Sequence, residues 1–365
     1  MKGKAAVFVK KGIPMEIVEY PLTPVGPGSI LVKVNRANIC GSDVHVWKGE
    51  FPWGGADQPR IIGHEMVGTV YELGAGVTTD SAGEPLKVGD RVTYLYFFPC
   101  GRCYACLHGQ PQACPNTMAR LGQTSTPPPH FIGAFAEYYY VQPGQYVYKV
   151  PDEIPDDMAA PANCALSQVL YGFHKTGINV GDTVVIQGAG GLGINAIAVA
   201  REMGAGNIIV IEQHPDRIKL AKAFGADHII DINQNPTPRE RISALRKLTK
   251  GRGADVVAEL TGIPAVSREG IGMTRMGGKY LWIGNIRGGQ NVEIDPSAVV
   301  LGNRTIVGVC TYEPWALSSA LGFLRRNKDK YPFGNILSQP FKLEEINTAF
   351  ELSAQGKVTR ATIVM

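Results

Sequence analysis

Four of the seven cysteines lie in the stretch CGRCYACLHGQPQAC, which runs from residue 100 to residue 114 of this 365-residue chain. The spacing C-x2-C-x2-C-x7-C supplies four thiolates, the number that closes a tetrahedral zinc shell. A shell made entirely of protein ligands leaves no position for substrate or water, so we expect this zinc to order a loop and not to catalyse. An iron-sulfur cluster and reduced thiols without a metal are the alternatives. The predicted structural zinc ligands are Cys100, Cys103, Cys106 and Cys114.

A second set of zinc-type ligands is spread along the chain, with Cys40 in NICGSDVH, His64 in IIGHEM and Cys164 in PANCALSQ. Each residue alone is weak evidence, because a lone cysteine or histidine is more often a packed or hydrogen-bonded residue. Together they supply three protein ligands and leave a fourth position open, as zinc catalysis requires. Only the tertiary fold could bring these residues together.

A glycine-rich motif follows the apolar run TVVIQ, where Gly188, Gly190 and Gly193 have the spacing G-x-G-x-x-G. The first glycine permits a tight turn, the second lets a pyrophosphate approach the backbone, and the third allows close helix packing. The amides of Gly191 and Leu192 are expected to face the anion at the start of a helix. This context favours a dinucleotide site over a turn that binds no ligand.

The adenosine end of that site is predicted at Glu212, which ends the next apolar strand, NIIVIE. A carboxylate there accepts hydrogen bonds from ribose hydroxyls and repels a 2'-phosphate, so NAD is favoured over NADP. Arg217 could contact the ribose or tolerate a phosphate, which leaves NADP as the less favoured cofactor. Thr261, at the end of DVVAELTG, is expected at a strand terminus beside the nucleotide, whereas Cys310 is expected inside a buried strand.

The elements that would position these residues change character along the chain. Up to about residue 160, short β-rich runs alternate with Gly, Pro and Asp turns, which is typical of a barrel-like β domain. From about residue 180, apolar strands alternate with helical segments, which predicts a parallel, doubly wound α/β sheet. Two amphipathic helices and a last strand, RATIVM, are expected to return to the first domain.

Composition excludes several other classes of protein. The 36 basic and 32 acidic residues form no long block of like charge, so a nucleic-acid or membrane-surface role is unsupported. The apolar run near the N-terminus is too short for a signal peptide or a membrane span, which predicts a cytoplasmic protein. Clustered cysteines in an odd total favour metal ligation in a reducing compartment over a disulfide framework.

Several motifs together resemble the zinc-containing medium-chain alcohol dehydrogenases over essentially the whole chain. The resemblance rests on CGSDVH, GHE, VGDRV, GAFAEYYYV, GAGGLG, the four-cysteine stretch and Cys164. It implies a GroES-like β-barrel catalytic domain over residues 1–163 and 311–365, and a Rossmann domain over residues 164–310. It also implies a homo-oligomer, either a dimer or a tetramer.

The resemblance also implies roles for residues around the predicted catalytic zinc, which Cys40, His64 and Cys164 would bind. Glu65 resembles a carboxylate that can enter the zinc shell, and Asp43 one that orients the histidine ligand. Ser42 and His45 resemble a proton relay that runs through the cofactor ribose toward solvent. Tyr96 and Trp47 are equally compatible with pocket walls and with plain core packing.

The expected activity is hydride transfer from a small-molecule alcohol, secondary or substituted, to NAD, giving a ketone or aldehyde, with two zinc ions per chain. Two other classes of protein are the alternatives. A zinc-free reductase on the same fold would use NADPH and would not need Cys40, His64 and Cys164. A nucleotide-binding structural or sensor protein would keep the glycine loop and the cysteine stretch but would lack an intact catalytic shell.

Overall fold

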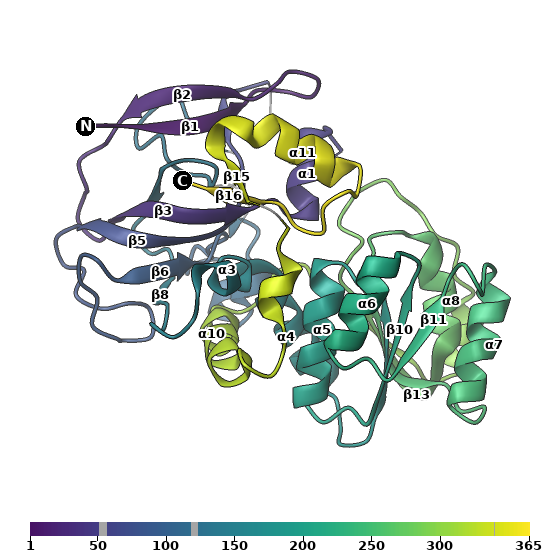
Figure 1. Cartoon of the computed structure of the whole chain (residues 1–365). Coiled ribbons are helices and arrows are strands. Elements are labelled where there is room, and N and C mark those ends of the chain that lie inside the picture. The colour runs from purple at the N-terminus through teal and green to yellow at the C-terminus, as the bar shows by residue number, and fades with distance from the viewer. Residues whose placement is uncertain (51–56, 118–122, 339) are drawn as a thin grey trace. The chain divides into compact units, whose positions relative to one another are not determined.

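The computed structural model describes residues 1–50, 57–117, 123–338 and 340–365 (Figure 1). The chain divides into two compact units, of which the first comprises Met1–Ser167, Glu313–Asp329 and Phe333–Met365, and the second Gln168–Tyr312 and Lys330–Pro332. The chain first leaves the first unit after Ser167, the opening residue of helix α4 (Ser167–Thr176). Cys164 therefore lies in the first unit, together with Cys40 and His64.

The first unit is built mainly from short strands, as its alternating sequence predicts. One sheet has the order β2-β1-β4, and a larger one has the order β15-β16-β3-β5-β6-β8 with β7 also paired to β3. Their apolar sides form a core in which the rings of Tyr94 and Tyr139 lie 4.0 Å apart between centroids. The strands are β1 (Lys2–Phe8), β2 (Glu16–Pro21), β3 (Ile30–Asn38), β4 (Arg60–Ile61), β5 (Glu65–Leu73), β6 (Arg91–Tyr94), β7 (Tyr138–Val141), β8 (Val147–Lys149), β15 (Pro340–Lys342) and β16 (Thr362–Val364).

The C-terminal strand of this unit lies beside one of its first strands. β16 pairs antiparallel with β3, with Ile363 opposite Ala37, and Figure 1 shows this yellow strand against the purple one. The helical segments of the unit are short, apart from α10 and α11. They are α1 (Gly41–Trp47), α2 (Tyr104–Leu107), η1 (Pro111–Ala113), α3 (Asp156–Ala159), the π-helical turn η3 (Ala162–Leu166), α10 (Trp315–Asn327), η4 (Phe333–Ile336), η5 (Leu343–Glu345) and α11 (Ile346–Ala354).

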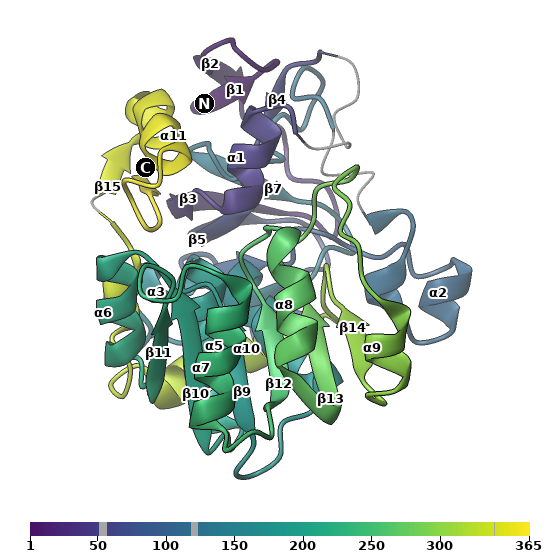
Figure 2. The same cartoon turned by 90° about the vertical axis from the view of Figure 1, so that its right-hand side faces the viewer.

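The second unit holds a parallel sheet of order β11-β10-β9-β12-β13-β14, whose strands appear side by side in Figure 2. Helices α5 and α6 cover one face and α7 and α8 the other (Figure 1), so β9 and β12 are buried along their whole length. The predicted doubly wound fold is confirmed. Its elements are α4, β9 (Thr183–Gln187), α5 (Gly191–Glu202), β10 (Asn207–Glu212), α6 (Pro215–Ala223), β11 (His228–Asp231), α7 (Pro238–Leu248), β12 (Ala254–Glu259), α8 (Ala265–Met273), β13 (Thr274–Trp282), α9 (Pro296–Val300) and β14 (Thr305–Gly308).

The order of strands in this sheet reverses direction between β9 and β12, and the crevice beyond the carboxyl ends of these strands is where ligands of open α/β sheets bind.

At the edge of the sheet farthest from β11, strand β14 ends at Gly308. The expectation that Cys310 is buried in a strand is therefore wrong, because it follows the strand and is exposed. Among the described residues, no helix is long and apolar enough to cross a membrane.

Candidate active site and metal centres

Four potential metal ligands from three separate segments converge in the first unit. Cys40 caps the N-terminus of α1, His64 and Glu65 stand where β5 begins, and Cys164 lies in η3. One ligand atom from each lies within 4.8 Å of all the others. The Cys40 and Cys164 sulfurs are 3.8 Å apart, and His64 Nε2 is 3.3 Å from the Cys164 sulfur.

The spacing of these donors fits a tetrahedral zinc ion. Two thiolates at about 2.3 Å from a tetrahedral zinc lie about 3.8 Å from each other, and a thiolate and an imidazole nitrogen lie slightly closer. The two separations that involve Cys164, to the Cys40 sulfur and to His64 Nε2, match these values to within a few tenths of an ångström. Three such ligands from soft and borderline donors suit zinc and leave a fourth position for a substrate oxygen.

Asp43 orients the histidine of this cluster. Its carboxylate lies 3.0 Å from His64 Nδ1 and also accepts the Cys40 backbone N–H at 2.8 Å. With Nδ1–H donating to Asp43, the Nε2 lone pair of His64 faces the Cys164 sulfur. Burial alone would lower the pKa of His64, but the charge and hydrogen bond of Asp43 outweigh it and raise that pKa well above its usual value. A metal ion bound at Nε2 would therefore have to displace a proton from the ring.

The contact between the two thiols of the cluster shifts their pKa values in opposite directions. The hydrogen bond from Cys164 holds the pKa of Cys40 well below its usual value, and the same contact, with burial, raises the pKa of Cys164. Cys40 is thus poised as a thiolate, the form in which a cysteine ligates metal.

Glu65 is held by a partner that sequence reasoning missed. Arg360 Nη1 lies 2.7 Å from both carboxylate oxygens of Glu65, and the two side chains are buried. Burial raises the pKa of Glu65, while the guanidinium opposes that rise. The only sequence signal was an arginine at the start of the apolar run RATIVM, 295 residues away.

Ser42 and His45 both lie in α1, where a separation of three residues places them on the same helix face. His45 Nδ1 is 2.7 Å from the Glu50 carboxylate, and its side chain is 29% exposed, so it lies at the solvent side of the helix. The ring of Tyr96 lies 4.6 Å from that of His64, which places it beside the candidate metal ligands. Trp47 packs instead on Phe350 as part of the core.

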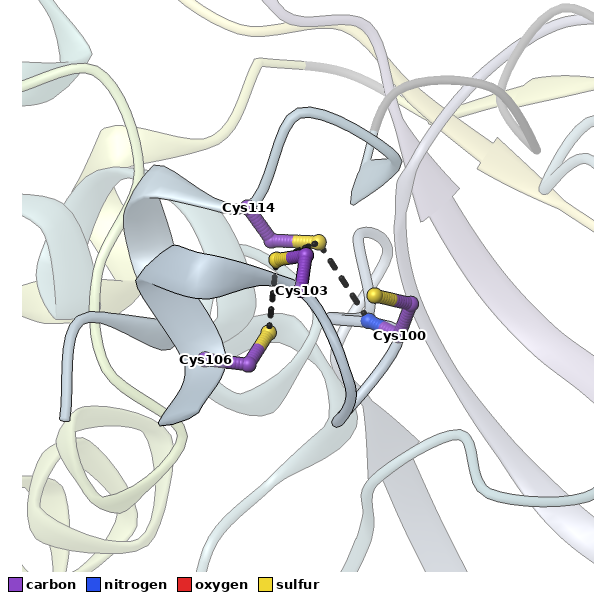
Figure 3. Close-up of side chains that lie close together, drawn as sticks. All are labelled: Cys100, Cys103, Cys106 and Cys114. Atoms are coloured by element: carbon purple, nitrogen blue, oxygen red, sulfur yellow. Dashed lines mark hydrogen bonds between the residues drawn. The ribbon is translucent and has the colours of Figure 1, made fainter. Parts of the chain in front are cut away.

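The four-cysteine stretch folds into a separate small lobe, in which the side chains turn toward one another (Figure 3). All four sulfurs lie within 4.8 Å of one another, with 3.5 Å from Cys103 to Cys106 and 3.7 Å from Cys103 to Cys114. Backbone and Asn116 donors lower the pKa of Cys100 to about 6. Burial and the Cys103 contact raise the pKa of Cys106 to about 11. The separations between these sulfurs are those expected of four thiolates around one tetrahedral metal ion.

In the second unit, the glycine motif forms the turn from β9 into α5. Gly188 has φ +91°, and a Cβ there would lie 2.6 Å from Thr261 Cγ2. A Cβ on Gly193 would lie 1.9 Å from the Gly188 carbonyl oxygen, so only glycine allows the helix to start this close to the turn. Gly191 and Leu192 are the first residues of α5, and their amides lie at its positive end. Around Gly190, a Cβ would meet open space.

Glu212 ends β10 as predicted, but its carboxylate is already hydrogen-bonded. It accepts backbone N–H groups from Ala189 at 2.9 Å, Gln213 at 2.7 Å and His214 at 3.1 Å. A carboxylate has about four lone-pair sites, so about one remains for a ribose hydroxyl. Arg217 lies in the following helix, α6, and its side chain is half-buried.

Comparisons with known proteins identify the family to which this two-unit architecture belongs. Residues 26–152 match the family model described as alcohol dehydrogenase GroES-like domain, and residues 191–326 match zinc-binding dehydrogenase. The 5-exo-hydroxycamphor dehydrogenase of Pseudomonas putida is 33% identical over 363 residues, which cover 99% of this chain and 98% of that one. The chain belongs to the zinc-containing alcohol dehydrogenase family. The chain is also 32% identical over 369 residues to the L-threonine 3-dehydrogenase of Pyrococcus horikoshii, and the match covers 100% of this chain and 99% of that one.

Solved structures agree with this membership. An alcohol dehydrogenase of Thermotoga maritima matches with a TM-score of 0.93 and 32% identity, covering 100% of this chain and 99% of that one. The benzyl alcohol dehydrogenase of Acinetobacter calcoaceticus matches with a TM-score of 0.86 and 26% identity, with 100% and 99% covered. The dehydrogenase is therefore a zinc-dependent, NAD(P)-linked oxidoreductase that acts on CH–OH groups of small molecules.

Proposed function

We propose that this dehydrogenase oxidises a secondary or substituted alcohol to the ketone or aldehyde and passes the hydride to NAD. The observation that carries the proposal is the convergence of Cys40, His64 and Cys164, at zinc-compatible separations, in the first unit. The names of two relatives, 5-exo-hydroxycamphor dehydrogenase and L-threonine 3-dehydrogenase, point to hydroxyls on secondary carbons, which supports the substrate class.

The catalytic zinc would be held by Cys40, His64 and Cys164, with Asp43 fixing the imidazole. Bound there, zinc supplies Lewis-acid chemistry that lowers the pKa of an alcohol hydroxyl by several units. Glu65 is the reserve carboxylate of the site. Arg360 Nη1 contacts both of its oxygens, which supports a role in which Glu65 stays bound to Arg360 until the occupancy of the fourth position changes.

The proton of the alcohol would leave through residues of α1. Ser42 accepts it first, and His45 releases it to solvent, where its imidazole is partly exposed. The Glu50 carboxylate at 2.7 Å favours the His45 tautomer that donates from Nδ1, and this leaves Nε2 free to accept a proton.

The second zinc would be structural and held by the four cysteines of the lobe, Cys100, Cys103, Cys106 and Cys114. Its role is to clamp a segment that has little regular structure of its own, since α2 and η1 are only a turn long. Thiolates that must stay reduced for this purpose support a cytoplasmic location.

For the cofactor, we favour NAD over NADP because the Glu212 carboxylate stands, buried, where the adenosine ribose is expected. A 2'-phosphate would be repelled by this negative charge. Gly188, Gly190, Gly193 and the amides of Gly191 and Leu192 would bind the pyrophosphate. Arg217 and Thr261 would contact the ribose and the nicotinamide half, respectively.

We also propose that the dehydrogenase forms a homo-oligomer through the β14 edge. β14 is largely exposed, and Val300 and Leu301 of the preceding segment are 71% and 74% exposed. A second copy pairing with this edge would cover unpaired backbone groups and these apolar side chains. Light scattering of the purified protein distinguishes a monomer, a dimer and a tetramer.

The decisive experiment is metal analysis together with a substrate panel. Purified protein is expected to hold about two zinc ions per chain and to reduce NAD with secondary alcohols. The variant His64→Ala should lose one zinc and all turnover while its circular dichroism spectrum stays unchanged. Full activity after removal of both zinc ions would favour the zinc-free reductase, and nucleotide binding with no turnover on any alcohol would favour a binding protein.

A further inference from the structure

Glu259, the last residue of β12, carries a fully buried carboxylate that the proposed chemistry does not use. One oxygen accepts three hydrogen bonds, from the Thr261 amide at 2.7 Å, the Thr261 hydroxyl at 2.7 Å and the Gly262 amide at 2.8 Å. The other accepts the Asn285 side-chain amide at 2.7 Å. All four donors are neutral groups.

A carboxylate without access to water is costly unless its lone pairs are satisfied. Four short bonds to an ionised acceptor are of the strong, charge-assisted kind, so the groups that donate them are fixed in place. The end of β12 at Glu259 is therefore rigid and buried, whereas the end of a strand is often exposed to water.

The groups fixed by Glu259 belong to two different loops. Thr261 and Gly262 begin the loop after β12, whereas Asn285 lies in the loop after β13. The loops touch closely at Gly284, where a Cβ would lie 2.9 Å from both Glu259 carboxylate oxygens and 2.4 Å from the Gly262 nitrogen. The carboxylate thus clamps neighbouring loops at the carboxyl end of the sheet.

The clamp also reaches the glycine motif. The Thr261 side chain, bonded to Glu259 through its hydroxyl, turns its methyl group toward Gly188, where a Cβ would lie 2.6 Å from Thr261 Cγ2. The carboxylate therefore holds the loops after β12 and β13 directly, and it meets the loop after β9 only through the Thr261 methyl group.

We infer that Glu259 is a positioning residue for the nicotinamide half of the dinucleotide, an inference that rests on the proposed NAD-dependent function. In a doubly wound sheet each half of the strands serves one mononucleotide, and the glycine loop and Glu212 belong to the adenosine half. β12 and β13 lie across the switch point, in the other half. The loops that Glu259 holds are the ones against which the nicotinamide nucleotide must rest.

The test compares two ligands on the zinc-loaded, full-length enzyme. NADH affinity is measured by fluorescence titration, and AMP affinity by competition against NADH. Glu259→Met, which keeps the side-chain length but removes the acceptor, should weaken NADH at least tenfold and AMP less than threefold. Glu259→Gln keeps one acceptor oxygen for the Thr261 and Gly262 donors and should restore most of the NADH affinity.

The matched control is Glu269→Gln, which alters a buried glutamate of the same unit that pairs with Arg241. It should lower the melting temperature without changing the NADH-to-AMP affinity ratio. If Glu259→Met does not fold, Asn285→Ala tests the same clamp and should weaken NADH about threefold with AMP unchanged. A ratio that stays at the wild-type value in the clamp variants, or that shifts equally in the control, overturns the inference. A wild-type enzyme that binds neither NADH nor NADPH overturns the proposed function as well.

Discussion

The hydrogen bond between Asp43 and His64 allows us to predict by how much the variant Asp43→Asn should lose zinc affinity. Asp43 accepts from two donors, His64 Nδ1 at 3.0 Å and the Cys40 N–H at 2.8 Å. Asparagine has one acceptor oxygen, so in Asp43→Asn one of these donors must face an NH2 group. If that donor is the imidazole, the ring adopts the other tautomer and Nε2 carries the hydrogen, which blocks ligation.

The expected loss is the one typical of a removed carboxylate behind a metal-binding histidine, about 10-fold to 100-fold in zinc affinity. This corresponds to about 1.4 to 2.7 kcal/mol. The same range follows from the loss of one hydrogen bond to a charged acceptor, about 1.5 to 3 kcal/mol. Because the four-cysteine lobe is untouched, only one of the two zinc ions should be weakened.

The assay is zinc content by mass spectrometry after equilibration in a series of chelator-buffered zinc solutions. Asp80→Asn is the control, because Asp80 is also buried and accepts backbone N–H groups, from Ala82, Glu84 and Lys149, away from the cluster. The control should lower stability and keep both zinc ions. An Asp43→Asn enzyme whose zinc affinities stay within twofold of wild type would refute the reasoning.

Three further predictions concern the glycine loop, the proton route and the lobe. Gly193→Ala places a Cβ 1.9 Å from the Gly188 oxygen, so NADH binding should fall at least tenfold while zinc content is unchanged; unaltered NADH affinity would contradict this. His45→Gln should lose more turnover as pH falls below about 7, because hydroxide must then take the proton and its concentration drops tenfold per pH unit; an equal loss at all pH values would argue against a relay. Cys106→Ser should release one zinc and lower the melting temperature or dissociate the oligomer, seen by native mass spectrometry; loss of hydride transfer in a variant that keeps its assembly and the other zinc ion would contradict a structural role.

Local patterns made several features predictable from sequence. The four cysteines of the lobe lie within one short loop, so their spacing alone nearly determines that the sulfurs meet. The glycine motif is likewise a local turn between a strand and a helix, and its steric demands act over a few residues. Alternating apolar strands and helices indicated the doubly wound sheet, because a strand covered on both faces must be apolar throughout.

Some local interpretations still failed or remained open without the fold. Cys310 lies two residues beyond the end of β14, and its side chain is exposed although its neighbours Val309 and Thr311 are buried, a difference that the apolar run does not reveal. Trp47 was compatible with a pocket wall or the core, and its contact with Phe350 places it in the core.

Long-range contacts were decided only by the tertiary structure, because no local propensity links residues that meet after the chain has folded. Sequence alone supplied the residue types that could bind a catalytic zinc, yet the separations of Cys40, His64 and Cys164 come from packing α1, β5 and η3 together. The pairing of Arg360 with Glu65 requires β16 to add to the sheet beside β3. The sequence by itself determined the ligand chemistry and the class of fold; the fold determined which of these side chains lie within ligand distance of one another and which buried charges are paired.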